Sequence, residues 1–186
     1  MRVIGGIFKG KKLLLPSDKI TRPLRDIVKE SIFNLIDHSN KIHINIKNSS
    51  ILDLFSGSGS FGIECLSRNA KKVFFFENYS NVLKILKNNL NSIKNKNNYK
   101  IFEDDCFDFF NSKKDINLKF DIIFIDPPFR ELRVNEIIDA IKDKNLLNKN
   151  GLIIIHRHKK DNLKLSKKIF VFEERIYGIS KISFAN

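Results

Sequence analysis

One stretch, from Ile51 to Gly62, constrains the fold of this chain more than any other. It reads ILDLFSGSGSFG, and the amphipathic run FGIECLSR overlaps its end. A buried strand, a tight turn and a helix N-terminus are the simplest interpretation. Gly57, Gly59 and Gly62 have the G-x-G-x-x-G spacing, which lets the backbone approach a ligand closely because no Cβ intervenes. An ordinary strand-to-helix connection has the same appearance, so this spacing alone does not establish a ligand site.

A second loop, Asp126-Pro127-Pro128-Phe129, directly follows the apolar run 120–125. Two consecutive prolines stop both a strand ladder and a helix, so the chain must leave the sheet here as a rigid loop. Open α/β folds bind ligands at the carboxyl ends of their parallel strands. The two loops therefore predict a shared ligand-binding edge, and a stiff surface turn is the less favoured interpretation.

From residue 51 onward, strand-like and helix-like segments alternate. Strands are expected at 51–55, 72–77, 99–103, 120–125 and 152–156, the last after a turn at Asn150-Gly151, and helices at 61–68, 81–94, 107–110 and 134–144. This alternation predicts a mostly parallel sheet with helices on both faces, an α/β fold. The tail differs, because 168–175 and 179–184 read as a hairpin joined at Tyr177-Gly178. It predicts an antiparallel strand inserted at the sheet edge.

The first 40 residues form a basic head before this pattern begins. Residues 1–22 predict a small hairpin or extended arm, and 24–37 predict a helix that begins after Pro23. We therefore divide the chain into an N-terminal extension, 1–40, and a main domain, 41–186. Six head residues are predicted to contact RNA, with a merely solvated surface as the alternative: Arg2, Lys9, Lys11, Lys12, Arg22 and Arg25.

Charge and composition limit the remaining possibilities. The net charge of +13 favours a polyanionic partner, although the chain is rich in Lys throughout. The basic stretch 157–168 is a second candidate for holding an RNA backbone. No run of eighteen apolar residues and no charged-then-apolar opening segment is present, so we expect a cytoplasmic protein without a membrane partner. We also expect it to be a monomer. Cys65 and Cys106 lack a C-x-x-C partner, so no metal site is expected.

Three acidic residues lie at the ends of successive predicted strands: Asp53 in the first, Glu77 closing the second and Asp105 just after the third. Together they suggest a nucleoside-containing cofactor. An acid such as Glu77 can accept both ribose hydroxyls, and Asp105 can accept the adenine amino group, with Cys106 beside the ring. Dinucleotide binding by an NAD-dependent oxidoreductase is the competing use of the glycine spacing. Asp53, however, lies four residues before Gly57, where a phosphate would be repelled. The positively charged sulfonium and amino group of S-adenosylmethionine fit this position better.

The second loop can supply the acceptor side of a methyl transfer. The lone pair of a base's exocyclic amine is delocalised into the ring, so the protein must position the nitrogen and draw its protons away. The Asp126 carboxylate and the Pro127 carbonyl can accept the two N–H bonds, and Phe129 can stack on the base. Unstacking a base is easier in RNA loops than in a duplex.

At these residues the chain resembles the class I S-adenosylmethionine-dependent methyltransferases, and more narrowly the bacterial RsmD-like family. The matching segments span nearly the whole chain: RVIGG at 2–6, TRP at 21–23, SIFN at 31–34, LDLFSGSG at 52–59, DPPF at 126–129 and YG at 177–178. The resemblance implies a seven-stranded Rossmann-like fold and methylation of guanine N2 in 16S ribosomal RNA. Asn69 stands where the family has a glycine, and asparagine can also adopt the left-handed conformation.

The resemblance also implies a set of site residues. Asp53, Gly57 and Gly59 would contact the methionine part of the cofactor, Glu77 the ribose and Asp105 the adenine. Phe55 and Cys106 belong to the same predicted cofactor site, and Asp126, Pro127, Pro128 and Phe129 would hold the guanine. A DNA amino-methyltransferase, a methyltransferase for another RNA and a non-catalytic RNA-binding module remain as alternatives.

Overall fold

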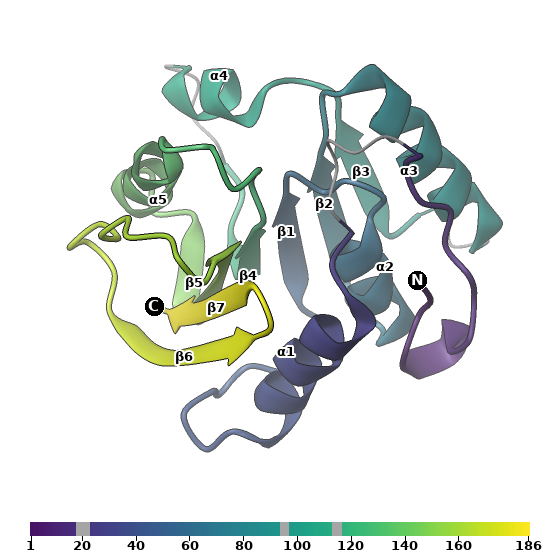
Figure 1. The fold of residues 1–186 in the computed structure, drawn as a ribbon, viewed down its shortest axis with the longest axis horizontal. Helices are drawn as coiled ribbons and strands as arrows, with labels where there is room; N and C mark the ends of the chain where they lie inside the picture. Colours follow the sequence, from purple (N-terminus) through teal and green to yellow (C-terminus); the bar gives the residue numbers. More distant parts are fainter. Residues whose placement is uncertain (18–22, 94–96, 113–116) are drawn as a thin grey trace.

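The computed structural model describes residues 1–17, 23–93, 97–112 and 117–186 (Figure 1). Seven strands form one sheet in the order β3-β2-β1-β4-β5-β7-β6. Their bounds are β1 Ser50–Leu54, β2 Lys72–Phe76, β3 Tyr99–Phe102, β4 Phe120–Ile125, β5 Leu147–His158, β6 Val171–Tyr177 and β7 Ser180–Ala185. The first five strands pair in parallel, whereas β7 pairs antiparallel with both β5 and β6. The predicted α/β sheet and its inserted antiparallel strand are confirmed.

Alternation of side chains along the strands explains why helices cover both faces. Ile51, Phe75 and Phe124 point into one core with α1, α2 and α3, while Leu52 and Phe76 point into the other with α4 and α5. Successive strand residues face opposite sides of a sheet, so an unbroken apolar run needs cover on both. The helices are α1 Asp26–His38, α2 Ser60–Ser67, α3 Ser80–Ser92, α4 Cys106–Asn111 and α5 Val134–Asp143.

The N-terminal arm runs beside α2 and α3 (Figure 1). An isolated antiparallel bridge joins Arg2 to Lys12 around a short 3-10 helix, η1, at Gly6–Phe8. Val3 and Leu13 are buried in the same core as α1 and the sheet. The described part of the head is therefore packed against the main domain, and the boundary at residue 40 stays a prediction.

Several details differ from the sequence-based expectation, and two of them concern β5 and α1. The turn predicted at Asn150-Gly151 is wrong, because β5 already begins at Leu147 and pairs there with Phe120. A register shift follows this pair, and Asn150 has a φ of 65° within it. A bulge of this kind takes up extra residues without ending the strand. The helix expected from residue 24 begins at Asp26.

None of the helices in the described ranges has the length and apolar character needed to cross a bilayer.

Candidate active site

The glycine loop after β1 is held in an unusual backbone conformation. Phe55, Gly57 and Gly59 have φ values of 59°, 58° and 81°. Positive φ is rare for a residue with a bulky side chain, so the conformation of Phe55 marks a tightly determined turn. Gly62 lies in the first turn of α2, where an added Cβ would be 2.2 Å from the Phe75 ring. The third glycine of the motif thus allows α2 to pack closely on the sheet.

Asp53 is almost fully buried at the end of β1. Its Oδ2 accepts a hydrogen bond of 3.0 Å from the Gly62 backbone N–H, and the side chain is 1% exposed. Burial raises the pKa of Asp53 well above its usual range, and the charges of Asp126 and Glu77 raise it further. A buried carboxylate of this kind is stabilised in its charged form by a cation placed beside it.

Glu77 follows β2 and holds the glycine loop. Its Oε2 accepts from the Gly57 N–H at 2.9 Å, and its Oε1 accepts from the Tyr79 N–H at 2.9 Å. Burial raises the pKa of this carboxyl group, although these backbone hydrogen bonds partly oppose the shift. Each carboxylate oxygen can accept a further hydrogen bond, so Glu77 can still receive ligand hydroxyls.

Asp105 caps helix α4. Its Oδ1 accepts from the Phe107 N–H at 2.7 Å, and its Oδ2 accepts from the Asn78 side chain at 3.2 Å. Cys106 is buried, and burial raises the pKa of its thiol to about 12. Asp105, Cys106 and Gly59 are not among the residues that line the cavity described below. Their assignment to the cofactor stays a prediction.

The loop Asp126 to Phe129 leaves the carboxyl end of β4 next to β1. The Asp126 N–H donates to the Leu54 carbonyl at 3.3 Å. Asp126 Oδ1 lies 2.7 Å from His156 Nδ1, and His156 Nε2 lies 2.8 Å from Ser180 Oγ. Burial lowers the pKa of His156, but the charge and hydrogen bond of Asp126 outweigh it, so this pKa is raised above its ordinary value.

Arg157 supports the same loop from β5. Its guanidinium donates to the carbonyls of Pro128 at 3.4 Å and Phe129 at 3.2 Å, and it pairs with Asp161. The side chain is buried. The prediction that the stretch 157–168 holds RNA is therefore wrong for its first residue, because Arg157 is used inside the protein. Lys159, Lys160, Lys164, Lys167 and Lys168 are exposed.

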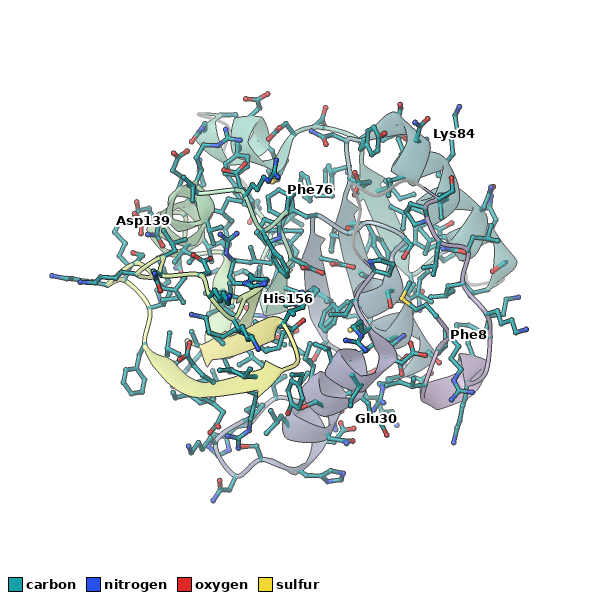
Figure 2. The ribbon with its side chains drawn as sticks, viewed as in Figure 1. Phe8, Glu30, Phe76, Lys84, Asp139 and His156 are labelled. Carbon is teal, nitrogen blue, oxygen red and sulfur yellow. The ribbon has the colours of Figure 1, made fainter. Side chains whose placement is uncertain are left out.

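Both loops open onto one cavity of about 560 Å³. Asp53, Gly57 and Glu77 line one part of it, and the loop 126–129 lines another, together with His156. Pro16, Pro23 and Leu24 add a wall from the N-terminal head. The predicted cofactor and acceptor loops thus share one space. Figure 2 shows His156 in the middle of the molecule, beside β7.

Five of the six predicted RNA-binding residues lie on the surface of the head. Arg2, Lys9, Lys11, Lys12 and Arg25 are exposed. Lys11 Nζ donates to the Ser92 carbonyl at 2.7 Å, which ties the arm to α3. Arg22 lies outside the described residues, and the role of all six in RNA binding stays a prediction.

Buried polar residues form the part of the site that the sequence did not reveal. The sequence-based predictions give His156 no role and include Arg157 only as part of the basic stretch 157–168. The sequence does indicate such a role for them, since these polar residues directly follow the apolar run LIII at 152–155. In the described ranges, no cluster of three or more His, Cys, Asp or Glu residues could hold a metal ion.

The model of the family described as "Conserved hypothetical protein 95" matches residues 1–186 of the chain. A relative from Haemophilus influenzae, named "Ribosomal RNA small subunit methyltransferase D", is 34% identical over 96% of this chain and 90% of its own length. The chain belongs to this family, the RsmD family. The family resemblance read from the sequence is confirmed.

Other similar proteins agree with this chain in sequence and in fold. A protein of the same name from Escherichia coli K12 is 31% identical and covers 88% of this chain and 77% of its own length. The solved structure of a putative methyltransferase from Escherichia coli superimposes with a TM-score of 0.83 at 27% identity, covering 100% of this chain and 96% of the other. The chain therefore has the class I methyltransferase fold.

Proposed function

We propose that this RsmD-family chain transfers a methyl group from S-adenosylmethionine to the exocyclic N2 of a guanine in 16S ribosomal RNA. The observation that carries this proposal is the shared cavity, which is bordered by the acidic glycine-loop region and by the Asp-Pro-Pro-Phe loop. A donor and an acceptor bound in one space can react directly. The names of the relatives support ribosomal RNA as the substrate.

The residues around the glycine loop, which border one part of the cavity, fit a positively charged cofactor. Asp53 is a buried carboxylate whose pKa is raised, and Glu77 holds the loop at Gly57. A bound cation would stabilise the charged form of Asp53, whereas a pyrophosphate would be repelled by it. S-adenosylmethionine supplies an electrophilic methyl group on a sulfonium. In this proposal Asp53 and the glycine loop bind its methionine part, and Glu77 binds its ribose.

The residues of the Asp-Pro-Pro-Phe loop, which border the other part of the cavity, would position the acceptor amine. Asp126 and the Pro127 carbonyl accept its two N–H bonds, and Phe129 stacks on the base. Bound S-adenosylmethionine would supply the methyl group, which would pass from sulfur to N2, and the Asp126 carboxylate would accept the proton that N2 loses. Orientation contributes roughly 7–11 kcal/mol to such a step, against about 1.5–3 kcal/mol for one hydrogen bond to a charged group. Positioning is therefore the main task of this loop.

The test uses the purified chain with small ribosomal subunits from cells that lack it and with S-adenosylmethionine labelled in its methyl group. The wild-type protein should label one guanine of 16S ribosomal RNA at N2, detected by nucleoside mass spectrometry. Asp126→Ala should bind the cofactor within about threefold of wild type by calorimetry and should lose methyl transfer at least a hundredfold. Labelling of another base, or full transfer by Asp126→Ala, would contradict the proposal.

We expect the protein to act as a monomer in the cytoplasm, with the exposed basic residues of the head holding RNA around the extruded base. Size-exclusion chromatography with light scattering measures the oligomeric state directly.

A further inference from the structure

A chain of hydrogen bonds connects Asp126 to the C-terminal hairpin. Asp126 Oδ1 lies 2.7 Å from His156 Nδ1, and His156 Nε2 lies 2.8 Å from Ser180 Oγ. The three residues come from the loop after β4, from β5 and from β7. His156 is 7% exposed, and it lines the cavity together with Asp126. No described residue donates a hydrogen bond to the second carboxylate oxygen, Oδ2.

We propose that His156 is a positioning residue for methyl transfer, which fixes Asp126 Oδ1 so that Oδ2 is available to the acceptor amine. Ser180 holds the histidine in the orientation that this task needs. The inference rests on the proposed function, because it assumes that Asp126 receives the amine. It adds two residues that the glycine loop and the Asp-Pro-Pro-Phe loop do not contain.

The chemistry of the three groups fixes the tautomer of His156. An ionised carboxylate only accepts hydrogen bonds, so His156 must carry a proton on Nδ1. In the neutral ring, Nε2 then accepts from the Ser180 hydroxyl. In the protonated ring, Nε2 donates, and the same hydroxyl turns to accept. Both hydrogen bonds therefore persist in either protonation state, and the position of Asp126 does not depend on the charge of the ring.

The charge of the ring does affect the reaction. Asp126 faces His156 from the loop after β4, and Ser180 faces it from β7. Arg157 and His158 follow it on β5, and the Asp53 carboxyl of β1 interacts electrostatically with Asp126. A protonated His156 adds positive charge near a cationic cofactor. Turnover should therefore fall as the pH falls through the pKa of His156, which lies above the ordinary histidine value.

Two substitutions of similar polarity separate positioning from a purely structural role. In His156→Asn, the amide nitrogen can occupy the place of Nδ1 and still donate to Asp126. In His156→Gln, the longer amide reaches the place of Nε2, so it keeps the Ser180 contact and leaves Asp126 without its donor. If His156 only supported the fold, the two variants would lose similar activity. If it positions Asp126, the asparagine variant should be the more active.

The experiment measures kcat and the cofactor KM from pH 6 to 9, using small subunits that lack the modification. We expect His156→Gln to lower kcat about 10–100-fold with the cofactor KM within about threefold, and His156→Asn to lower it less than about fivefold. The decrease of kcat at acidic pH should be absent from His156→Asn, because asparagine does not titrate. His38→Asn, which changes an exposed histidine at the end of α1, should keep the wild-type profile.

Ser180→Ala provides a second test, since it removes only the hydroxyl, and it should lower kcat about 3–10-fold. Melting temperature and cofactor binding are measured for each variant. The inference is overturned if His156→Asn and His156→Gln lower kcat equally, or if kcat of His156→Asn still falls at acidic pH. In either case the proposed function stands as long as Asp126→Ala is inactive. Full transfer by Asp126→Ala would overturn the proposed function as well, so the two failures are distinguishable.

Discussion

Glu64, on α2, is a buried charged residue whose substitution should destabilise the fold. It is 0% exposed, and its carboxylate accepts hydrogen bonds from the Ile4 N–H at 2.8 Å and the Gly5 N–H at 2.7 Å. Arg68 Nε donates to it at 3.1 Å, and Lys29 Nζ lies 3.7 Å away. This carboxylate therefore joins the N-terminal arm, α1 and α2 at one buried point.

Glu64→Gln keeps the shape of the side chain and removes its charge. Lys29 is also 0% exposed, so it would lose its buried counter-ion, and one backbone N–H of the arm would face an amide donor. Removing one partner of a buried pair costs about 3–5 kcal/mol. For a chain of this size, about 2–4 °C is lost per kcal/mol, so the melting temperature should fall by roughly 6–20 °C at pH 7.

The loss of stability in Glu64→Gln should be larger at neutral pH than at alkaline pH. Burial lowers the pKa of Lys29, and Glu64 raises it back in part, so Glu64→Gln lowers it further. The unfolded chain then binds more protons than the folded chain below the ordinary lysine pKa, and stability rises with pH in that window. The destabilisation should therefore be largest near pH 7 and smaller near pH 10.

The assay is thermal unfolding followed by circular dichroism at both pH values, for Glu64→Gln, Lys29→Met and the double variant. The double variant should be less destabilised than the sum of the single variants by more than about 1 kcal/mol, since neither charge is left unpaired. Glu30→Gln, on the exposed side of α1 (Figure 2), serves as the control and should change stability by less than about 0.5 kcal/mol. A Glu64→Gln melting temperature within 2 °C of wild type, about the shift for 1 kcal/mol or less, would refute this reasoning.

Two further substitutions test the site. Because the pKa of Asp53 is raised in the folded protein, its contribution to folding stability is present at acidic pH and is lost as the pH rises. Asp53→Asn should therefore raise the melting temperature of the cofactor-free protein at pH 8 but not near pH 4. The same variant should bind S-adenosylmethionine more than tenfold more weakly by calorimetry, and a lower melting temperature at pH 8 would contradict the argument. Arg157→Met leaves the carbonyls of Pro128 and Phe129 without their donor and should lower kcat about 10–100-fold with a smaller change in cofactor affinity. Arg157→Lys should recover part of this activity in the same methyl-transfer assay, and an unchanged kcat in Arg157→Met would contradict the supporting role.

Local features of the sequence determined the elements and their order. The alternation of apolar runs and amphipathic stretches predicted the parallel strands and their helices, because periodicity records which side of an element is buried. The C-terminal hairpin was predicted from the same kind of local signal. Its turn lies one residue later than predicted, at Gly178-Ile179, because Tyr177 still pairs with Ser180, and Gly178 has a φ of 59°. Asn69, expected to adopt the left-handed conformation in place of a glycine, has a φ of 64°.

Contacts between distant residues required the tertiary structure. His156 lies 30 residues from Asp126 and 24 from Ser180, yet all three meet because β5 lies between β4 and β7 in the sheet. No local pattern records which polar side chain will end beside which strand, since that depends on strand order and register. For the same reason, Arg157 looked like part of a basic surface and is a buried support of the Pro-Pro loop. The sequence by itself determined which elements form and which loops bear the chemistry, and only the packed sheet decided which side chains hold those loops in place.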